Sequence, residues 1–371
     1  MASEKVNSPP FRSRQERLLA RLENEGLRRL VITQPANIFY LTGFRGSAGA
    51  ALFGTMDPAY LWVDPRYALQ AGEQAQGTKL KVVRKPLLKS VGEFLGRHRR
   101  SVAGRVGFED SYITFAGLTT LREAAGPRVR FEAAGNLVEE LRAAKDAGEI
   151  ELMRQAASLT ARVLEGFRAK VRPGVRESDL AAEIEYQMRL EGADGAAFAT
   201  IVASGPRAAL PHARASSKEI LRNELVIVDC GAILAGYAAD MTRTYYTGPP
   251  PGRVRTLYEA VREAQQCAIE SARVGVKAGK VDRAARESLD RRGLGKYFTH
   301  STGHGVGLDV HEAPRLGRGQ KEQLQAGTVV AVEPGIYLEG FGGLRLEDTV
   351  LVGNQGPEVL TSLTKDDWYI G

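Results

Sequence analysis

Short apolar runs alternate with longer amphipathic stretches over the first 140 residues of the chain. Apolar runs rich in branched and aromatic residues predict four strands, at 27–33, 38–44, 59–64 and 79–83. Apolar positions at helical spacing predict two helices, at 13–27 and 87–99. Strands and helices mixed in this way indicate a small α/β domain.

A long amphipathic stretch follows, with apolar or small residues at the 3,4 spacing of one helix face from Ile150 to Val171. Asp146, with Glu149 three residues later, is a helix-start signal of the capping-box kind, and Pro173 is a stop signal. At 371 residues the chain is long for a single core. We therefore place a domain boundary just before this helix and expect domains at 1–140 and 141–371.

The second domain contains a faint internal duplication. Residues 171–192 and 276–295 each follow a predicted long helix and contain a glycine break, a second helix and a glycine stop. The alignment places Gly174 opposite Gly279, 105 positions later, a period too long for a solenoid. Two similar halves packed as one domain are expected, each followed by a strand hairpin.

The first of these hairpins, "LVIVDCGAILAGYAADMTRTYYTG", carries two aspartates. Asp229 and Asp240 are symmetric about a turn near residues 234–236, so a hairpin centred there sets them directly opposite each other. Directly opposed residues point to the same face, with Cβ atoms about 4.5 to 5.5 Å apart. Carboxylates that close repel unless a positive charge lies between them.

The second hairpin, "VVAVEPGIYLEGFGGLRLEDTVLV", repeats the device. Glu333 and Glu347 are symmetric about Gly340, whereas Asp348 points to the other face. Pro334 and several glycines favour a bulge, which leaves this register open. Four inward carboxylates need balancing cations, and two divalent metals bring the sum of charges to zero.

Three of the five histidines gather in "HSTGHGVGLDVHEAP". One imidazole added to four carboxylates suits a two-metal centre of manganese, cobalt, iron or zinc. Glycines at 303, 305 and 307 oppose a helix, so we expect an extended or looped segment. His300 and His304 then share one side, with His311 opposite or past a bend. Spacing leaves open which histidine binds metal.

These segments, with "VEPGIY" and "GLRLED", resemble in order and spacing the metal-dependent proline peptidases of the pita-bread fold. That family comprises prolidase (Xaa-Pro dipeptidase) and aminopeptidase P, and the resemblance covers essentially the whole chain. It implies an α/β (α+β) fold. The resemblance further implies that a creatinase-like N-terminal α/β domain would support dimerisation and partly roof the active site. The C-terminal pita-bread domain has pseudo-two-fold halves around a curved antiparallel sheet.

The resemblance also implies roles for individual residues. The metal ligands would be Asp229, Asp240, His304, Glu333 and Glu347. A catalytic histidine falls at His212 in "ASGPRAALPHARAS". Glu333 is the candidate for moving the proton, and His311 and His212 for hydrogen bonding to substrate. The expected substrate-binding residues are His300, His311, Arg345, Arg45 and Tyr337. Two divalent ions are expected, manganese first, with cobalt or zinc as alternatives.

Composition and charge narrow the partners. The net charge of +7 comes with one dense basic cluster, around Arg97, Arg99 and Arg100, and no aromatic platform beside it, so no nucleic-acid partner is expected. No apolar run approaches the about 20 residues that cross a bilayer, and the N-terminus is too polar for a secretory signal. Two cysteines, Cys230 and Cys267, fit a reducing compartment. We expect a cytoplasmic homodimer, associated through the N-terminal domain.

The choice within the family turns on the substrate. A dipeptidase must recognise the free carboxylate after proline, for which arginine is the expected reader. Candidates are Arg45 in the "GFRGSAG" loop, Arg315, Arg318 and Arg345. We favour hydrolysis of Xaa-Pro dipeptides. The alternatives are an aminopeptidase P that acts on longer peptides with proline second and, more remotely, a catalytically inactive peptide-binding relative.

Overall fold

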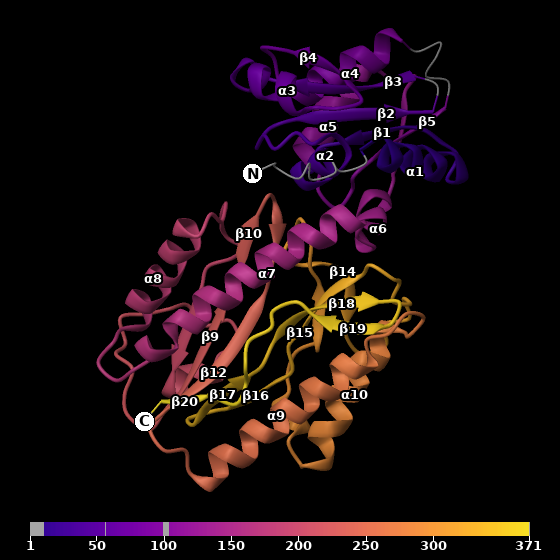
Figure 1. Ribbon diagram of the computed structural model, residues 1–371. Helices are drawn as coiled ribbons and strands as arrows, with labels where there is room; N and C mark the ends of the chain where they lie inside the picture. Colours follow the sequence, from indigo (N-terminus) through magenta and orange to yellow (C-terminus); the bar gives the residue numbers. More distant parts are fainter. Residues whose placement is uncertain (1–10, 56, 99–103, 371) are drawn as a thin grey trace, which may run out of the picture. The chain divides into compact units, whose positions relative to one another are not determined.

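The computed structural model describes residues 11–55, 57–98 and 104–370 (Figure 1). The chain divides into two compact units between Arg142 and Ala143. Of the basic cluster expected near the first unit's fourth helix, Arg99 and Arg100 lie outside the described residues. Among those described, no helix is both long and apolar enough to span a membrane.

The N-terminal unit is built on a six-stranded mixed sheet with the order β4-β3-β2-β1-β5-β6. Its strands are β1 (Leu27–Ile32), β2 (Ala50–Gly54), β3 (Asp57–Val63), β4 (Thr78–Val82), β5 (Arg105–Phe108) and β6 (Arg130–Ala133). Its helices are α1 (Phe11–Asn24), α2 (Pro35–Thr42), α3 (Ala68–Gln74), α4 (Leu87–Arg97), α5 (Phe115–Ala125) and α6 (Leu137–Ala143). Strand residues such as Leu52 and Trp62 form a core with Val91 of α4 and Leu121 of α5. The α/β class expected for this region is confirmed.

The strand predicted at 38–44 is wrong, because this segment forms α2. Pro35 occupies the first turn, and Gly43 ends the helix in the left-handed conformation, with φ of 81°. Both are helix signals at those positions. Ile38, Tyr40 and Leu41 are all buried, so the apolar run has the continuous pattern of a buried strand.

The C-terminal unit has four main helices around antiparallel strands. The helices are α7 (Ala147–Phe167), α8 (Glu177–Leu190), α9 (Gly252–Ser271) and α10 (Ala278–Arg291). The strands are β7 (Gly195–Ala196), β8 (Ile201–Ser204), β9 (Leu225–Cys230), β10 (Ala232–Leu234), β11 (Tyr237–Ala238), β12 (Met241–Thr247), β13 (Gly303–Gly305), β14 (Glu312–Leu316), β15 (Val329–Val332), β16 (Gly335–Leu338), β17 (Gly342–Arg345), β18 (Asp348–Gly353), β19 (Gly356–Val359) and β20 (Tyr369–Ile370). Short 3₁₀ turns lie at 168–170, 205–209 and 295–297. The predicted capping box at Asp146 and Glu149 is present at the start of α7.

Two similar halves make up this unit. One apolar core joins α7 and α8 to β8, β9 and β12, and another joins α9 and α10 to β15–β18. In Figure 1 the two helix pairs accordingly flank the strands. The sheets have the orders β20-β12-β9-β8 and β14-β13-β15-β18-β19, antiparallel except for β12 with β20. This is the pseudo-symmetric arrangement that the sequence predicted.

The alignment of the two halves needs one correction. The glycine equivalent to Gly174 is Gly275, 101 positions later (275 − 174), not Gly279. Gly174 has φ of 86° and Gly275 has φ of 79°, and each donates its N–H to a chain carbonyl, of Ile220 and Leu324 respectively. Gly279 lies inside α10, where its closeness to the Gln320 backbone leaves little space for a side chain.

Candidate metal centre

The first carboxylate hairpin is offset by one residue from the predicted centre. Leu234 pairs with Tyr237, so the turn is Ala235–Gly236, and both residues have positive φ, 50° and 88°. Positive φ at both central positions is the mark of a tight two-residue hairpin turn. Asp229 consequently pairs with Thr242, and Asp240 lies two residues away along the chain. A shift of two keeps both aspartates on the same face.

The second carboxylate hairpin has the predicted register. Gly335 pairs with Arg345, and Val332 pairs with Asp348. Both pairs are symmetric about Gly340, so Glu333 and Glu347 oppose each other between them. The Pro334 interruption separates β15 from β16 without shifting the register.

One cavity of about 660 Å³ in the C-terminal unit brings most of the predicted site residues together. Those that line it are Asp229, Asp240, Glu333, Glu347, His212, His300, His304, His311 and Arg345. Arg315 also lines it, whereas Arg318 lines a different cavity. Arg45 belongs to the N-terminal unit, where its guanidinium stacks on Phe39, with its carbon 4.9 Å from the ring centre.

Three of the carboxylates, Asp229, Asp240 and Glu347, are buried, and Glu333 is half-buried beside them. Ligand atoms of Asp240, His304 and Glu347 all lie within 4.8 Å of one another. Burial, with the neighbouring carboxylates second, raises the pKa values of Asp240 and Glu347 well above their usual range. Burial also raises the pKa of Glu333 to about 7. The one guanidinium at the cluster, Arg345, therefore does not balance the negative charge of four carboxylates.

Asp229 shows the same lack at a single atom. Its Oδ2 accepts a hydrogen bond of 2.7 Å from Arg345. Its Oδ1 is buried and has no hydrogen-bond partner among the described residues. A buried carboxylate oxygen without a partner is costly, and a metal ion would satisfy it. The donor set of four carboxylates and one imidazole therefore fits divalent cations.

The structure separates the histidines that the sequence left undecided. His304 lies on β13 with Nδ1 3.0 Å from the Gly305 carbonyl, so that nitrogen carries the proton. Its Nε2 lies 3.6 Å from Asp240 and 3.8 Å from Glu333. Burial lowers the pKa of His304 to about 4, which keeps the ring neutral. His304 has a free nitrogen directed at the carboxylates, as a metal ligand needs.

His300 has both ring nitrogens engaged by the protein. Its Nδ1 lies 2.7 Å from the Ser301 carbonyl, and its Nε2 lies 2.9 Å from the Tyr337 hydroxyl. Arg345 donates to the same hydroxyl at 2.9 Å, which directs the Tyr337 proton toward His300. Burial lowers the pKa of His300 to about 4. His311 lies beside His304, with ring centres 4.2 Å apart and ring planes tilted by 54°.

Arg345 links several parts of the site. Besides Asp229 and Tyr337, its guanidinium donates to the Thr242 hydroxyl at 3.1 Å and to the Pro211 carbonyl at 3.0 Å. It therefore holds a carboxylate of one hairpin and the backbone next to His212. Its direct partner is Asp229 of the other hairpin, not Glu347 on its own strand.

Comparison with known proteins decides the family. Residues 151–354 match the model of metallopeptidase family M24, and residues 14–144 match the creatinase/prolidase N-terminal domain. The chain belongs to metallopeptidase family M24. The Xaa-Pro dipeptidase of Pyrococcus furiosus is 35% identical over 96% of this M24 chain and 99% of its own length.

Solved structures of M24 members have the same fold. The Xaa-Pro dipeptidase from Bacillus anthracis has a TM-score of 0.92 and 34% identity, covering 97% of this chain and 100% of its own. The X-Pro aminopeptidase from Thermotoga maritima has a TM-score of 0.87, also with 34% identity, covering 96% and 99%. The M24 chain thus has the same sequence identity, 34%, to a solved dipeptidase and to a solved aminopeptidase.

Sequence reasoning missed Thr242. Its buried hydroxyl donates a hydrogen bond of 2.6 Å to Glu347, from the opposite half of the unit. The available signal was its position two residues after Asp240, which places both on one face of the hairpin. A contact between halves is not visible in either hairpin alone.

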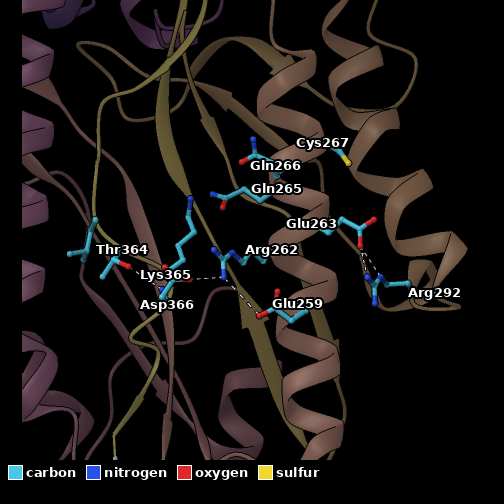
Figure 2. A pocket seen from close by; sticks show the side chains of 11 residues that line it. Glu259, Arg262, Glu263, Gln265, Gln266, Cys267, Arg292, Thr364, Lys365 and Asp366 are labelled. Carbon is cyan, nitrogen blue, oxygen red and sulfur yellow. Dashed lines mark hydrogen bonds and ion pairs between the residues drawn. The ribbon is translucent and has the colours of Figure 1, made fainter.

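Another cavity, of about 560 Å³, is lined by residues of α9 and of the segment 363–366 (Figure 2). Figure 2 shows Arg262 paired with Asp366 and Arg292 with Glu263, so these charges neutralise each other. Lys365, also on this cavity, pairs at 2.6 Å with the buried Asp348, which faces away from the metal cluster as predicted. Neither His304 nor any of the four clustered carboxylates is among the residues that line this cavity.

Proposed function

We propose that this M24 peptidase hydrolyses the Xaa-Pro bond of dipeptides. The observation that carries the proposal is the cavity that unites four carboxylates and His304 with exposed groups for a substrate, including His212, His311 and Arg315. Relatives named Xaa-Pro dipeptidase match over nearly their whole length. The aminopeptidase from Thermotoga maritima keeps release of the first residue from longer Xaa-Pro peptides as the second candidate.

The proposed metal ligands are the residues with carboxylate or imidazole atoms facing the cluster, namely Asp229, Asp240, His304, Glu333 and Glu347. They would hold two divalent ions, for which manganese is the first choice and cobalt or zinc the alternatives. Bound divalent metals lower the pKa of water and polarise the scissile carbonyl. Asp240 and Glu347 occupy equivalent positions in the two halves, which suits ligands shared between both ions.

The remaining polar groups have separate proposed roles in proton transfer, oxyanion stabilisation and positioning. Glu333, on the cavity beside His304, is the proposed group that takes a proton from the attacking water and returns it to the departing nitrogen. His212 and His311 are exposed on the cavity and can donate to the oxyanion. His300 lines the cavity, and the buried Tyr337, which is not among the lining residues, holds it by a hydrogen bond. Arg345 positions Asp229 beside the substrate.

The carboxylate reader is the residue that separates the two candidate activities. Arg315 lines the cavity and is exposed, so its guanidinium is available to a substrate carboxylate. Arg45 remains the candidate from the N-terminal unit. A dipeptide places its free carboxylate directly after proline, whereas a longer peptide has a neutral peptide bond there.

The N-terminal unit is proposed to roof the site and to form the homodimer, as its creatinase/prolidase domain match suggests. A cytoplasmic location is proposed because both cysteines are free thiols, Cys230 buried and Cys267 half-buried. The proposed substrate is a small peptide with proline second. Neither nucleic acid nor membrane is a proposed partner.

The deciding experiment compares hydrolysis of Ala-Pro and Ala-Pro-Ala by the manganese-loaded protein. Faster cleavage of Ala-Pro is expected, and Arg315→Met should raise its KM by on the order of tenfold because a charge-assisted hydrogen bond is lost. Arg45→Ala tests the other candidate in the same assay, and Arg318→Met is the matched control. Preference for Ala-Pro-Ala would favour the aminopeptidase, and cleavage of neither would support the inactive relative.

A further inference from the structure

Glu177 is a buried carboxylate far along the chain from every proposed ligand. It stands at the start of α8, and its side chain is 0% exposed. One oxygen accepts from the Ser204 amide at 2.8 Å and the Ser204 hydroxyl at 2.9 Å. The other accepts from the Ser216 amide at 3.1 Å and hydroxyl at 2.6 Å. The carboxylate therefore ties together the two ends of the segment 205–215.

That segment carries His212, and Arg207 connects Glu177 to a backbone carbonyl within the segment. The Arg207 Nε donates to Glu177 at 3.0 Å, while its terminal nitrogen donates to the Arg214 carbonyl at 2.6 Å. On the other side of His212, Arg345 donates to the Pro211 carbonyl at 3.0 Å. Two arginines thus hold the backbone, one on each side of His212. Each of them is paired with a buried carboxylate of its own.

The His212 imidazole has no such support of its own. Within the described parts of the chain, its ring makes no hydrogen bond or ion pair, although it lines the metal cavity. Its direction is consequently set by its backbone. A small displacement of that backbone would move the ring relative to a substrate, and misplacement of about 1 Å can cost on the order of 100-fold in rate.

We infer that Glu177 is a positioning residue, which acts through Arg207 and the two serines to set His212 against the bound substrate. The inference rests on the proposed role of His212 in Xaa-Pro hydrolysis. Glu177 does not itself line the cavity. A carboxylate is suited to this place because it accepts all five hydrogen bonds, whereas glutamine would present an N–H₂ group to a donor.

A double-mutant cycle tests the inference. Glu177→Gln is expected to lower kcat for Ala-Pro by on the order of 10- to 100-fold with unchanged metal content. In a His212→Ala background, the same substitution should cost less than about twofold, because the histidine it positions is gone. Equal losses in both backgrounds would overturn the inference, since they indicate a general structural role. The control is Glu183→Gln, at a half-exposed position of the same helix where the side chain pairs with Lys170, and it should leave kcat and metal content unchanged.

A readout independent of turnover separates this inference from the proposed function. The chain has only five histidines, so their ring resonances can be followed individually by NMR. Glu177→Gln should shift the resonance that disappears in His212→Ala and leave that of His98 in place, and an unmoved His212 signal would overturn the inference. Absence of Ala-Pro cleavage by the wild-type protein would instead remove the proposed function. If Glu177→Gln does not fold, Arg207→Met enters the same cycle, with the same expected and contradicting outcomes.

Discussion

The hairpin with Asp229 and Asp240 differs from the hairpin with Glu333 and Glu347 in register and in support. In the second hairpin the carboxylates are directly opposed, whereas in the first they are offset by two residues. Each hairpin is also held by the other. Thr349 donates to the Asp240 carbonyl at 2.8 Å, and Thr242 donates to the Glu347 carboxylate at 2.6 Å.

The residues that follow the second carboxylate of each hairpin differ in a similar way. Met241, after Asp240, packs into the apolar core of the first half. Asp348, after Glu347, is a buried charge held by Arg243 and Lys365. The two hairpins thus both carry carboxylates on the face toward the cavity, whereas the residues on their opposite faces differ in chemical type. The requirement for carboxylates applies to one face of the hairpins only.

The largest effect is expected from Asp240→Ala. Loss of this carboxylate should remove bound metal and lower activity by about a thousandfold, because a metal contributes several kcal/mol to transition-state stabilisation. Metal analysis and Ala-Pro turnover measure the two together. Asp366→Asn, whose parent side chain is 73% exposed, is the control and should keep both. Full metal content in Asp240→Ala would contradict the ligand assignment.

The mutual support of the hairpins is tested by two isosteric substitutions. Thr242→Val removes a hydrogen bond to a proposed ligand and should weaken metal affinity about 10- to 100-fold. Thr349→Val removes bonds to the Asp240 backbone and should lower the free energy of unfolding by about 1–3 kcal/mol, with a smaller change in affinity. Metal titrations and denaturant unfolding distinguish them. Equal affinity losses would mean that the hairpins are supported in the same way.

A pH series tests the charge of the cluster. In the metal-free chain the folded-state pKa values of Asp240 and Glu347 are raised, and that of Glu333 is about 7. Raised carboxyl pKa values favour the folded state at low pH, and this stability is lost as pH rises through them. Metal should therefore raise Tm by a few degrees more at pH 8 than at pH 6. If metal raised Tm by the same amount at both pH values, the carboxylates would not have the raised pKa values that shared burial causes.

The smallest effect is expected at the outer face of the second hairpin. Lys365→Met leaves Asp348 with Arg243 at 2.8 Å and Gln265 at 3.1 Å, so the charge keeps partners. The free energy of unfolding should fall by about 0.5–1.5 kcal/mol, with metal content retained. Arg262→Met, which removes the surface pair seen in Figure 2, should change it by less than about 0.5 kcal/mol. Loss of metal in Lys365→Met would show that Asp348 supports Glu347 directly.

The sequence predicted the second hairpin better than the first for a physical reason. Glycine at 340 marks the centre of the second turn, and strand pairing continues at the same register on both sides of Pro334. In the first hairpin the turn depends on Ala235 adopting positive φ, which an alanine seldom does. The one-residue error in the turn centre offsets the aspartates by two residues. Because side chains alternate with a period of two, Asp229 and Asp240 still lie on one face.

Other features required coordinates. Residue spacing left His300, His304 and His311 equivalent as ligands, and the family resemblance alone pointed to His304. The ring hydrogen bonds in the structure distinguish His304 from His300. The helix at 35–42 was hidden because burial on several sides removed its amphipathic pattern. Glu177 joins segments 27 and 39 residues away, a distance over which sequence pattern carries no contact information.

Anomalous diffraction from manganese-loaded crystals tests the central claim most directly. Two peaks about 3.5 to 4 Å apart are expected, bounded by Asp229, Asp240, His304, Glu333 and Glu347, with His300 still hydrogen-bonded to Tyr337. A peak bound by His300, or full occupancy without contact to Asp240 and Glu347, would contradict it.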